Sequence, residues 1–119
     1  MKIPLYVKQN VVRGLEMRKT YSKSERPVLS VKEANEKGVN SGITTGRILI
    51  KSYRNGYNIS DSMVKRIKSF LQRNMGQLEL AEREGWNEDK IFVARLIWGG
   101  DRTGRFQRRL EKYYEEKIQ

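Results

Sequence analysis

The sequence predicts a single all-α domain spanning residues 1–119, with five or six helices wrapped around a central buried helix at about residues 90–98. Three observations support this fold class. A chain of 119 residues can bury one modest core but not two. Apolar side chains recur at helical spacing in several segments. One of these segments, IFVARLIW at residues 91–98, is apolar almost all the way round, which is typical of a helix buried on every side.

The first helix is expected over residues 4–19. Proline stands near its first turn, where the N–H that proline lacks would have no partner. Val7, Val11 and Leu15 recur every four residues and form one apolar stripe. Gly14 either weakens this helix by about 1 kcal/mol or lets another helix approach it closely.

A polar loop and a short helix follow. Residues 20–27, TYSKSERP, are polar and end at a proline, so they predict a loop, which could serve as a flexible basic arm. Ser30 and Glu33 have the spacing of a capping box, in which each side chain bonds to the backbone N–H of the other. Gly38 is well placed to end this helix with a left-handed residue.

The third helix is the most ambiguous element. Residues 42–46, GITTG, predict a loop because glycine punctuates regular structure. Residues 48–50 fit either a short strand or a helix over about residues 45–55. Three basic residues have the spacing of one helix face, so the helix is favoured. They are Arg47, Lys51 and Arg54.

The fourth helix is the clearest, capped by Ser60 and covering about residues 61–74. Its apolar face consists of Met63, Val64, Ile67, Phe70 and Leu71. The following segment GQLELAEREGW, residues 76–86, reverses the charge and is expected to be a loop with one helical turn. Trp86 closes this loop and is expected to lie against the core.

Asn87 can cap the fifth helix, the central one. Arg95 is its one charged side chain within the apolar run, and we expect it to reach the surface or pair with an acid. The two glycines after Trp98 end this helix, because glycine accepts a positive φ without steric cost. Asp101 is then predicted to cap a sixth helix that extends to about Lys117.

The composition excludes most catalytic and metal sites. There is no cysteine and no histidine, which removes disulfides, thiolate nucleophiles, common zinc sites and the usual general base. The acidic cluster at residues 79–89 lacks the fixed spacing of a calcium loop and is interpreted as solvated. We therefore expect no enzyme, no metal and no cofactor. No apolar run has the length of a membrane span, which predicts a soluble intracellular protein without a membrane partner.

The formal net charge of +11 predicts an anionic partner. All the excess lies in residues 1–73, with 16 Lys and Arg against five acids, whereas residues 74–119 have nine of each and are neutral. Nucleic acid is the favoured partner, because arrays of cations on helix faces suit phosphate contacts. Of the two nucleic acids, DNA is favoured over RNA. The candidate residues are Arg13, Arg18, Lys19, Arg47, Lys51, Arg54, Lys65, Arg66, Lys68, Arg73, Arg102, Arg105 and Arg109.

Two further features could contribute to such binding. Tyr53 and Tyr57 stand near one helix end and could stack on bases, although packing in the core or at its rim is the favoured interpretation. The segment WGGDR at residues 98–102 fits a tight helix–turn–helix joint, which would direct Arg102, Arg105 and Arg109 at a groove. Acidic residues share that helix, so a structural joint is favoured over a recognition helix.

The sequence resembles a family of small helical domains encoded by tailed bacteriophages. The resemblance rests on RGLEMR at 13–18, NGYNISDSMVKRIKSF at 55–70 and ARLIWGGDRTGR at 94–105, in the order of that family's GLxxR, LSxxTVxRMxSF-like and WGGDxGR motifs. Phe106 stands where the family usually has tryptophan. The resemblance implies a phage origin, and we therefore expect the protein in the host cytoplasm or the virion interior. It implies little about mechanism, because the family has no established biochemical role.

An alternative function is that of a phage virion or host-takeover module that binds an acidic protein surface. An apolar stripe left exposed around Ile3, Leu5 and Tyr6 would favour such protein binding.

Overall fold

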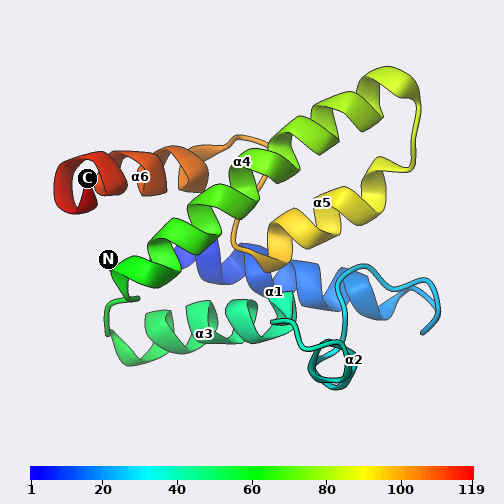
Figure 1. The fold of residues 1–119 in the computed structure, drawn as a ribbon, viewed down its shortest axis with the longest axis horizontal. Coiled ribbons are helices and arrows are strands. Elements are labelled where there is room, and N and C mark those ends of the chain that lie inside the picture. The colour runs from blue at the N-terminus through cyan, green and yellow to red at the C-terminus, as the bar shows by residue number, and fades with distance from the viewer.

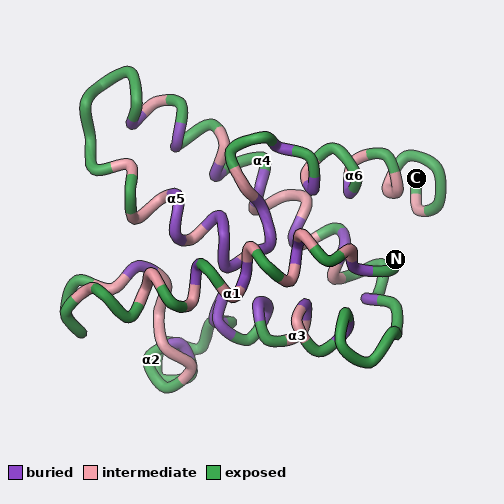
Figure 2. Tube along the Cα trace, turned by 180° about the vertical axis from the view of Figure 1, so that it is seen from behind, coloured by how far each residue is buried: buried purple, intermediate pink, exposed green.

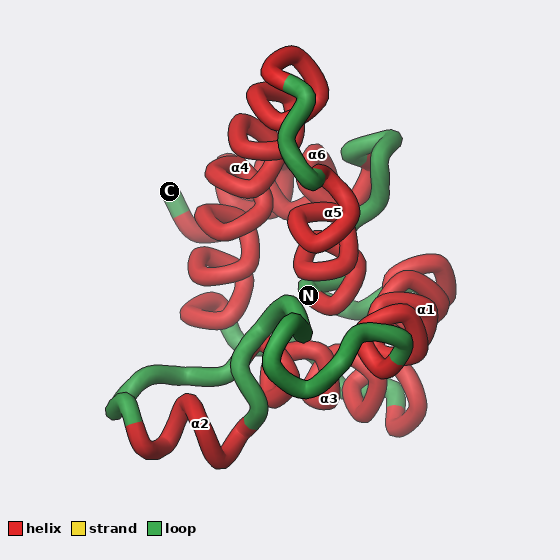
Figure 3. The backbone as a smooth tube through the Cα atoms, turned by 90° about the vertical axis from the view of Figure 1, so that its right-hand side faces the viewer, coloured by secondary structure: helices red, strands yellow, loops and turns green.

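The computed structural model describes residues 1–119 and consists of six α-helices, a C-terminal π-helical turn and connecting loops, without a strand (Figures 1 and 3). This confirms the prediction of a single all-α domain. The elements are α1 (Leu5–Lys19), α2 (Val31–Glu36), α3 (Gly42–Asn55), α4 (Asp61–Glu84), α5 (Glu88–Ile97), α6 (Arg105–Tyr113) and η1 (Tyr114–Ile118).

The central position of α5 is confirmed. Helices α1, α3 and α4 pack against it, and its residues Val93, Leu96 and Ile97 are fully buried (Figure 2). A Cβ added to Gly14 of α1 would lie 2.8 Å from both the Leu96 Cβ and the Ile97 backbone nitrogen. Gly14 therefore permits a close approach of α1 to α5.

Helix α3 begins at Gly42, so the predicted loop at 42–46 is wrong. The Ser41 hydroxyl accepts a hydrogen bond from the Ile43 N–H at 3.1 Å and caps the helix. A Cβ on Gly42 would lie 2.6 Å from the Trp98 Nε1, and a Cβ on Gly46 would lie 2.8 Å from the Ile97 carbonyl oxygen. The glycines serve helix packing, because the end of α5 crosses α3 at this point.

Helix α4 continues to Glu84, so the loop predicted for 76–86 is also wrong. Its buried positions follow alternating spacings of three and four residues along the whole helix. They are Val64, Ile67, Leu71, Asn74, Leu78 and Ala81. The polar Asn74 interrupts the apolar pattern, but its amide donates to the Ile91 carbonyl at 3.1 Å and is satisfied inside the core. Gly85, with a φ of 75°, ends the helix.

Trp86 is 58% exposed, contrary to the expectation that it packs against the core. The long α4 carries the chain past the core before it turns back into α5, so the turn forms a protruding tip (Figure 1).

The loop of residues 20–30 is fixed to α1, whereas a flexible arm was expected. The Arg18 Nε donates to the carbonyls of Pro27 and Val28, at 3.0 and 3.2 Å. The predicted capping box of α2 is present, with the Ser30 hydroxyl and the Glu33 carboxylate each bonded to the other's backbone N–H.

Candidate nucleic-acid interface

The outer face of α3 presents three exposed cations, Arg47, Lys51 and Arg54, which we call the α3 basic face. Their spacing of four and three residues places them along one side of the helix over about 10 Å. The helix contains no acidic residue, and none of the three cations takes part in an ion pair. Together with Ile50 and Asn55 they line a shallow, open hollow.

Two tyrosines at the C-terminal end of α3 are exposed, Tyr53 at 38% and Tyr57 at 43%. The Ser52 hydroxyl donates to the Tyr57 carbonyl at 2.6 Å, and Gly56 adopts a φ of 70°, so the turn that carries Tyr57 is well defined. Neither tyrosine is buried in the core, whereas packing at its rim agrees with their partial exposure. Both side chains are partly exposed at the end of the helix that carries the α3 basic face.

Arg18 and Lys19 lie at the C-terminal end of α1, and their roles differ. Burial lowers the pKa of Arg18, and the nearby cations Arg26 and Arg47 lower it further, while Glu33 opposes this. Arg18 is thus close to the α3 basic face, but its guanidinium is bound to the 20–30 loop. Lys19 is exposed and has no ion pair.

The four candidates on α4 point in different directions. Arg66 turns toward α3, donates to the Thr45 hydroxyl and lies 5.5 Å from the centre of the Trp98 ring. Lys68 turns toward the C-terminal end of the chain, with its Nζ 4.5 Å from the centre of the Tyr114 ring. Lys65 and Arg73 are exposed. Only Arg66 directly adjoins α3, and it is already engaged.

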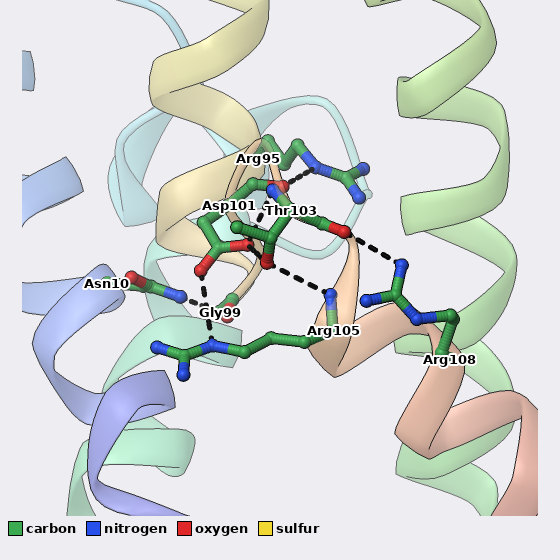
Figure 4. Close-up of polar contacts among 7 residues, drawn as sticks. All are labelled: Asn10, Arg95, Gly99, Asp101, Thr103, Arg105 and Arg108. Carbon is green, nitrogen blue, oxygen red and sulfur yellow. Dashed lines mark hydrogen bonds and ion pairs between the residues drawn. The ribbon is translucent and has the colours of Figure 1, made fainter.

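The turn between α5 and α6 is held by a dense set of hydrogen bonds (Figure 4). Gly99 has a φ of 90°, and its carbonyl accepts from the Asn10 amide at 2.9 Å. The Asp101 carboxylate accepts from the N–H and the hydroxyl of Thr103. Asp101 therefore stabilises the turn, and the prediction that it caps the sixth helix is wrong: α6 begins only after Gly104.

The arginines of this turn are largely engaged within the protein. Arg105 lies 3.5 Å from the Asp101 carboxylate and 3.7 Å from the centre of the Tyr6 ring. Arg102 pairs with Glu82 at 2.7 Å. Arg109 is exposed and has no ion pair. The segment thus acts as a structural joint, and only Arg109 of the three is fully available.

Arg13 lies apart from the α3 basic face, beside this joint. Its guanidinium is 5.5 Å from the centre of the Phe92 ring, and that of Arg102 is 4.4 Å from the same ring. Because α3 and α6 run along opposite edges of the molecule (Figure 1), the thirteen candidate residues do not form one surface.

Arg95 has a structural role that the sequence did not reveal. It is 0% exposed and donates to the Asp101 and Leu71 carbonyls at 2.7 and 3.0 Å and to the Gln107 side chain at 2.9 Å. Burial lowers its pKa, and the charge of Asp101 opposes this. It neither reaches the surface nor forms an ion pair, because carbonyls from α4, the turn and α6 converge on it.

The ion pairs leave the charge excess of residues 1–73 in place. The acids of residues 74–119 that form ion pairs do so with Arg83, Arg102 and Arg105 from the same part of the chain. The one pair between the two parts joins Lys90 to Glu25. The acids of residues 74–119 therefore form no ion pair with the cations of residues 1–73.

Two other features bear on the class of protein. No three acidic side chains converge on a point where a metal ion could be held. None of the helices combines the length and the apolar character needed to cross a bilayer.

No protein-family model, curated protein or solved structure matches the chain.

Proposed function

We propose that the protein binds nucleic acid, with DNA as the expected partner, through the α3 basic face. The observation that carries the proposal is a helix with three exposed cations, no acid and no internal ion pair. Such a face has a positive potential that only an external anion can compensate. The two arginines can contact phosphate oxygens through paired N–H groups, and Lys51 acts as a point charge between them.

Contacts of this kind read the phosphate backbone, so the proposed binding has little sequence specificity. Tyr53 and Tyr57 add exposed rings on which unpaired bases can stack. The phage-type motifs support a viral setting, with the protein acting in the host cytoplasm or on a packaged genome.

The alternative is an acidic protein surface that docks on the same face. The stripe expected to favour this, around Ile3, Leu5 and Tyr6, is not formed, since Ile3 is buried and only Leu5 is largely exposed. Salt separates the two partners. If each cation of the face neutralises one phosphate, log K falls with log salt with a slope of about −2.7 for duplex DNA.

The test is the triple variant R47E/K51E/R54E, measured by fluorescence anisotropy with a labelled duplex at several salt concentrations. We expect affinity to fall by at least about 100-fold, because three attractive contacts become repulsive. The matched control is K32E/K37E/K117E, which makes the same change in net charge at exposed residues without ion pairs. An equal loss in both variants, or none in the first, would refute a localised site.

A charge reversal on α4 is a less direct test. Arg66 and Lys68 contact aromatic rings and Arg66 also bonds to Thr45, so replacing them changes packing as well as charge. Lys65 is exposed and makes no such contact, so K65E isolates the contribution of α4. We expect K65E to weaken binding only a few-fold, through its general effect on the potential.

A further inference from the structure

The α4–α5 tip, residues 81–88, carries the most exposed large apolar side chain of the protein, Trp86. Its ring borders a hollow that is also lined by Ala81, Glu82, Gly85 and Glu88. Burying a tryptophan is among the larger gains available to a small domain, so a partner that covers Trp86 would gain apolar contact at a defined turn. The proposed nucleic-acid face does not use this residue.

The tip and the residues that flank it carry an excess of acids. Residues 79–89 contain five acids and one arginine. All three acids within residues 81–88 take part in ion pairs, Glu82 and Glu88 with Arg102 and Glu84 with Arg83. The negative charge without an ion pair lies on Glu79 and Asp89, which are exposed and flank the tip on either side. A partner for the tip should therefore have a hollow that can hold an aromatic ring and that is surrounded by basic side chains.

The same chain offers such a partner on α3. The hollow on the α3 basic face is formed by Ile50 among Arg47, Lys51, Arg54 and Asn55. An indole ring placed there would cover the apolar stems of the long side chains and face their charges, which favours both burial and cation–π contact. Arginine and tryptophan are also the residues most enriched at energetically important points of protein interfaces.

We infer that copies of this protein associate head to tail, with Trp86 of one copy seated in the hollow on α3 of the next. The tip and α3 lie toward opposite ends of the molecule (Figures 1 and 3), so one copy cannot satisfy both surfaces itself. Because the two contacting surfaces differ, each added copy leaves one tip and one α3 face free. The assembly grows as a chain unless it closes into a ring.

The association uses the α3 basic face and so competes with the proposed nucleic acid. Addition of a short duplex should dissolve the assemblies, and high salt should weaken them because the contact pairs opposite charges. The contact area is small, so the association is weak and is observed at high protein concentration.

The decisive experiment combines two variants that each lack one of the two surfaces. W86A lacks the tip and R47E/K51E/R54E lacks the α3 basic face. Sedimentation equilibrium at about 0.1–1 mM protein and low salt measures the mass of each alone and of the mixture. We expect wild type to form species beyond the dimer, each variant alone to be monomeric, and the equimolar mixture to form a dimer and nothing larger. The control L5A removes another exposed apolar side chain and should associate as wild type does.

Monomeric wild type at the highest concentration, or a mixture that stays monomeric, would overturn the head-to-tail contact. Continued self-association of the α3 variant would instead indicate contacts between two tips and would equally overturn it. W86A should bind duplex DNA with the affinity of wild type, so loss of association and loss of nucleic-acid binding are distinguished in one protein. Circular dichroism of each variant establishes that it is folded.

Discussion

The α3 basic face and the joint between α5 and α6 contain similar numbers of cations and use them in opposite ways. On α3 the cations are exposed and have no partner within the protein. In the joint, Arg95, Arg102 and Arg105 are bound to carbonyls, carboxylates or rings. Cation density along the chain therefore does not identify the cations that are available to an external anion. An arginine that already has partners within the protein must lose them to bind a phosphate, whereas an arginine without such partners need not.

The largest difference between the two regions should appear in stability when a buried cation is compared with an exposed one. R95M keeps much of the side-chain volume but removes the donors for Leu71, Asp101 and Gln107. We expect a loss of about 3–5 kcal/mol in the free energy of unfolding, because several hydrogen bonds from one buried guanidinium are lost together. The control K51M on α3 should stay within about 0.5 kcal/mol of wild type. Urea unfolding measures both, and equal effects would contradict the distinction.

The next largest effect concerns the backbone of the joint. A Cβ on Gly99 would lie 2.8 Å from both Phe106 and Val7, at a φ of 90°. G99A should therefore cost about 3 kcal/mol through overpacking and backbone strain. Gly56 at the end of α3 has a φ of 70° but nothing within 4 Å of its added Cβ. G56A should cost only about 1 kcal/mol, from the left-handed conformation alone. Thermal unfolding of the pair isolates the packing contribution.

A smaller effect with a distinctive pH dependence is expected at Asp101. Burial alone would raise its pKa, but hydrogen bonds from Thr103 and Asn10 and the charge of Arg105 bring it below the usual value of 3.8. The ionised carboxylate therefore stabilises the fold above pH 3.8, and this contribution is lost as the pH falls through the lower pKa of the folded state. D101N should cost about 1 kcal/mol at pH 7. The difference in the free energy of unfolding between D101N and wild type should become smaller as the pH is lowered. A difference that does not change with pH would show that the charge of Asp101 is not involved.

The smallest effect is expected at Arg102, an exposed member of an ion pair in the joint. R102Q should change stability by no more than about 1 kcal/mol, because exposed pairs contribute little. It should also leave duplex affinity within about twofold of wild type, since this guanidinium is already bound to Glu82. K51Q on α3 should reduce the salt slope of binding by about 0.9. A larger binding defect in R102Q than in K51Q would contradict the proposed site on α3 and favour the joint instead.

The candidate site was predicted from the sequence in part. The helical spacing of Arg47, Lys51 and Arg54 and the absence of acids around them are visible in the printed chain. The sequence could not show which of the other cations lack a partner within the protein. Arg18 donates to a loop carbonyl, and Arg66 and Arg105 contact aromatic rings that are distant in sequence. The position of Trp86 was predicted wrongly, because its exposure depends on how far α4 extends beyond the core.

The sequence by itself determined the all-α class, the buried α5 and the helix starts at Pro4, Ser30 and Ser60. These features depend on periodicity and on caps, which act within one or two turns of the chain. Only the tertiary structure decided that Gly42 lies inside a helix and that Asn74 and Arg95 lie inside the core. The physical reason is that a glycine can end a helix or permit close packing within one, and which of these occurs depends on whether another helix crosses at that point. A buried polar group is likewise tolerated only where atoms distant in sequence complete its hydrogen bonds.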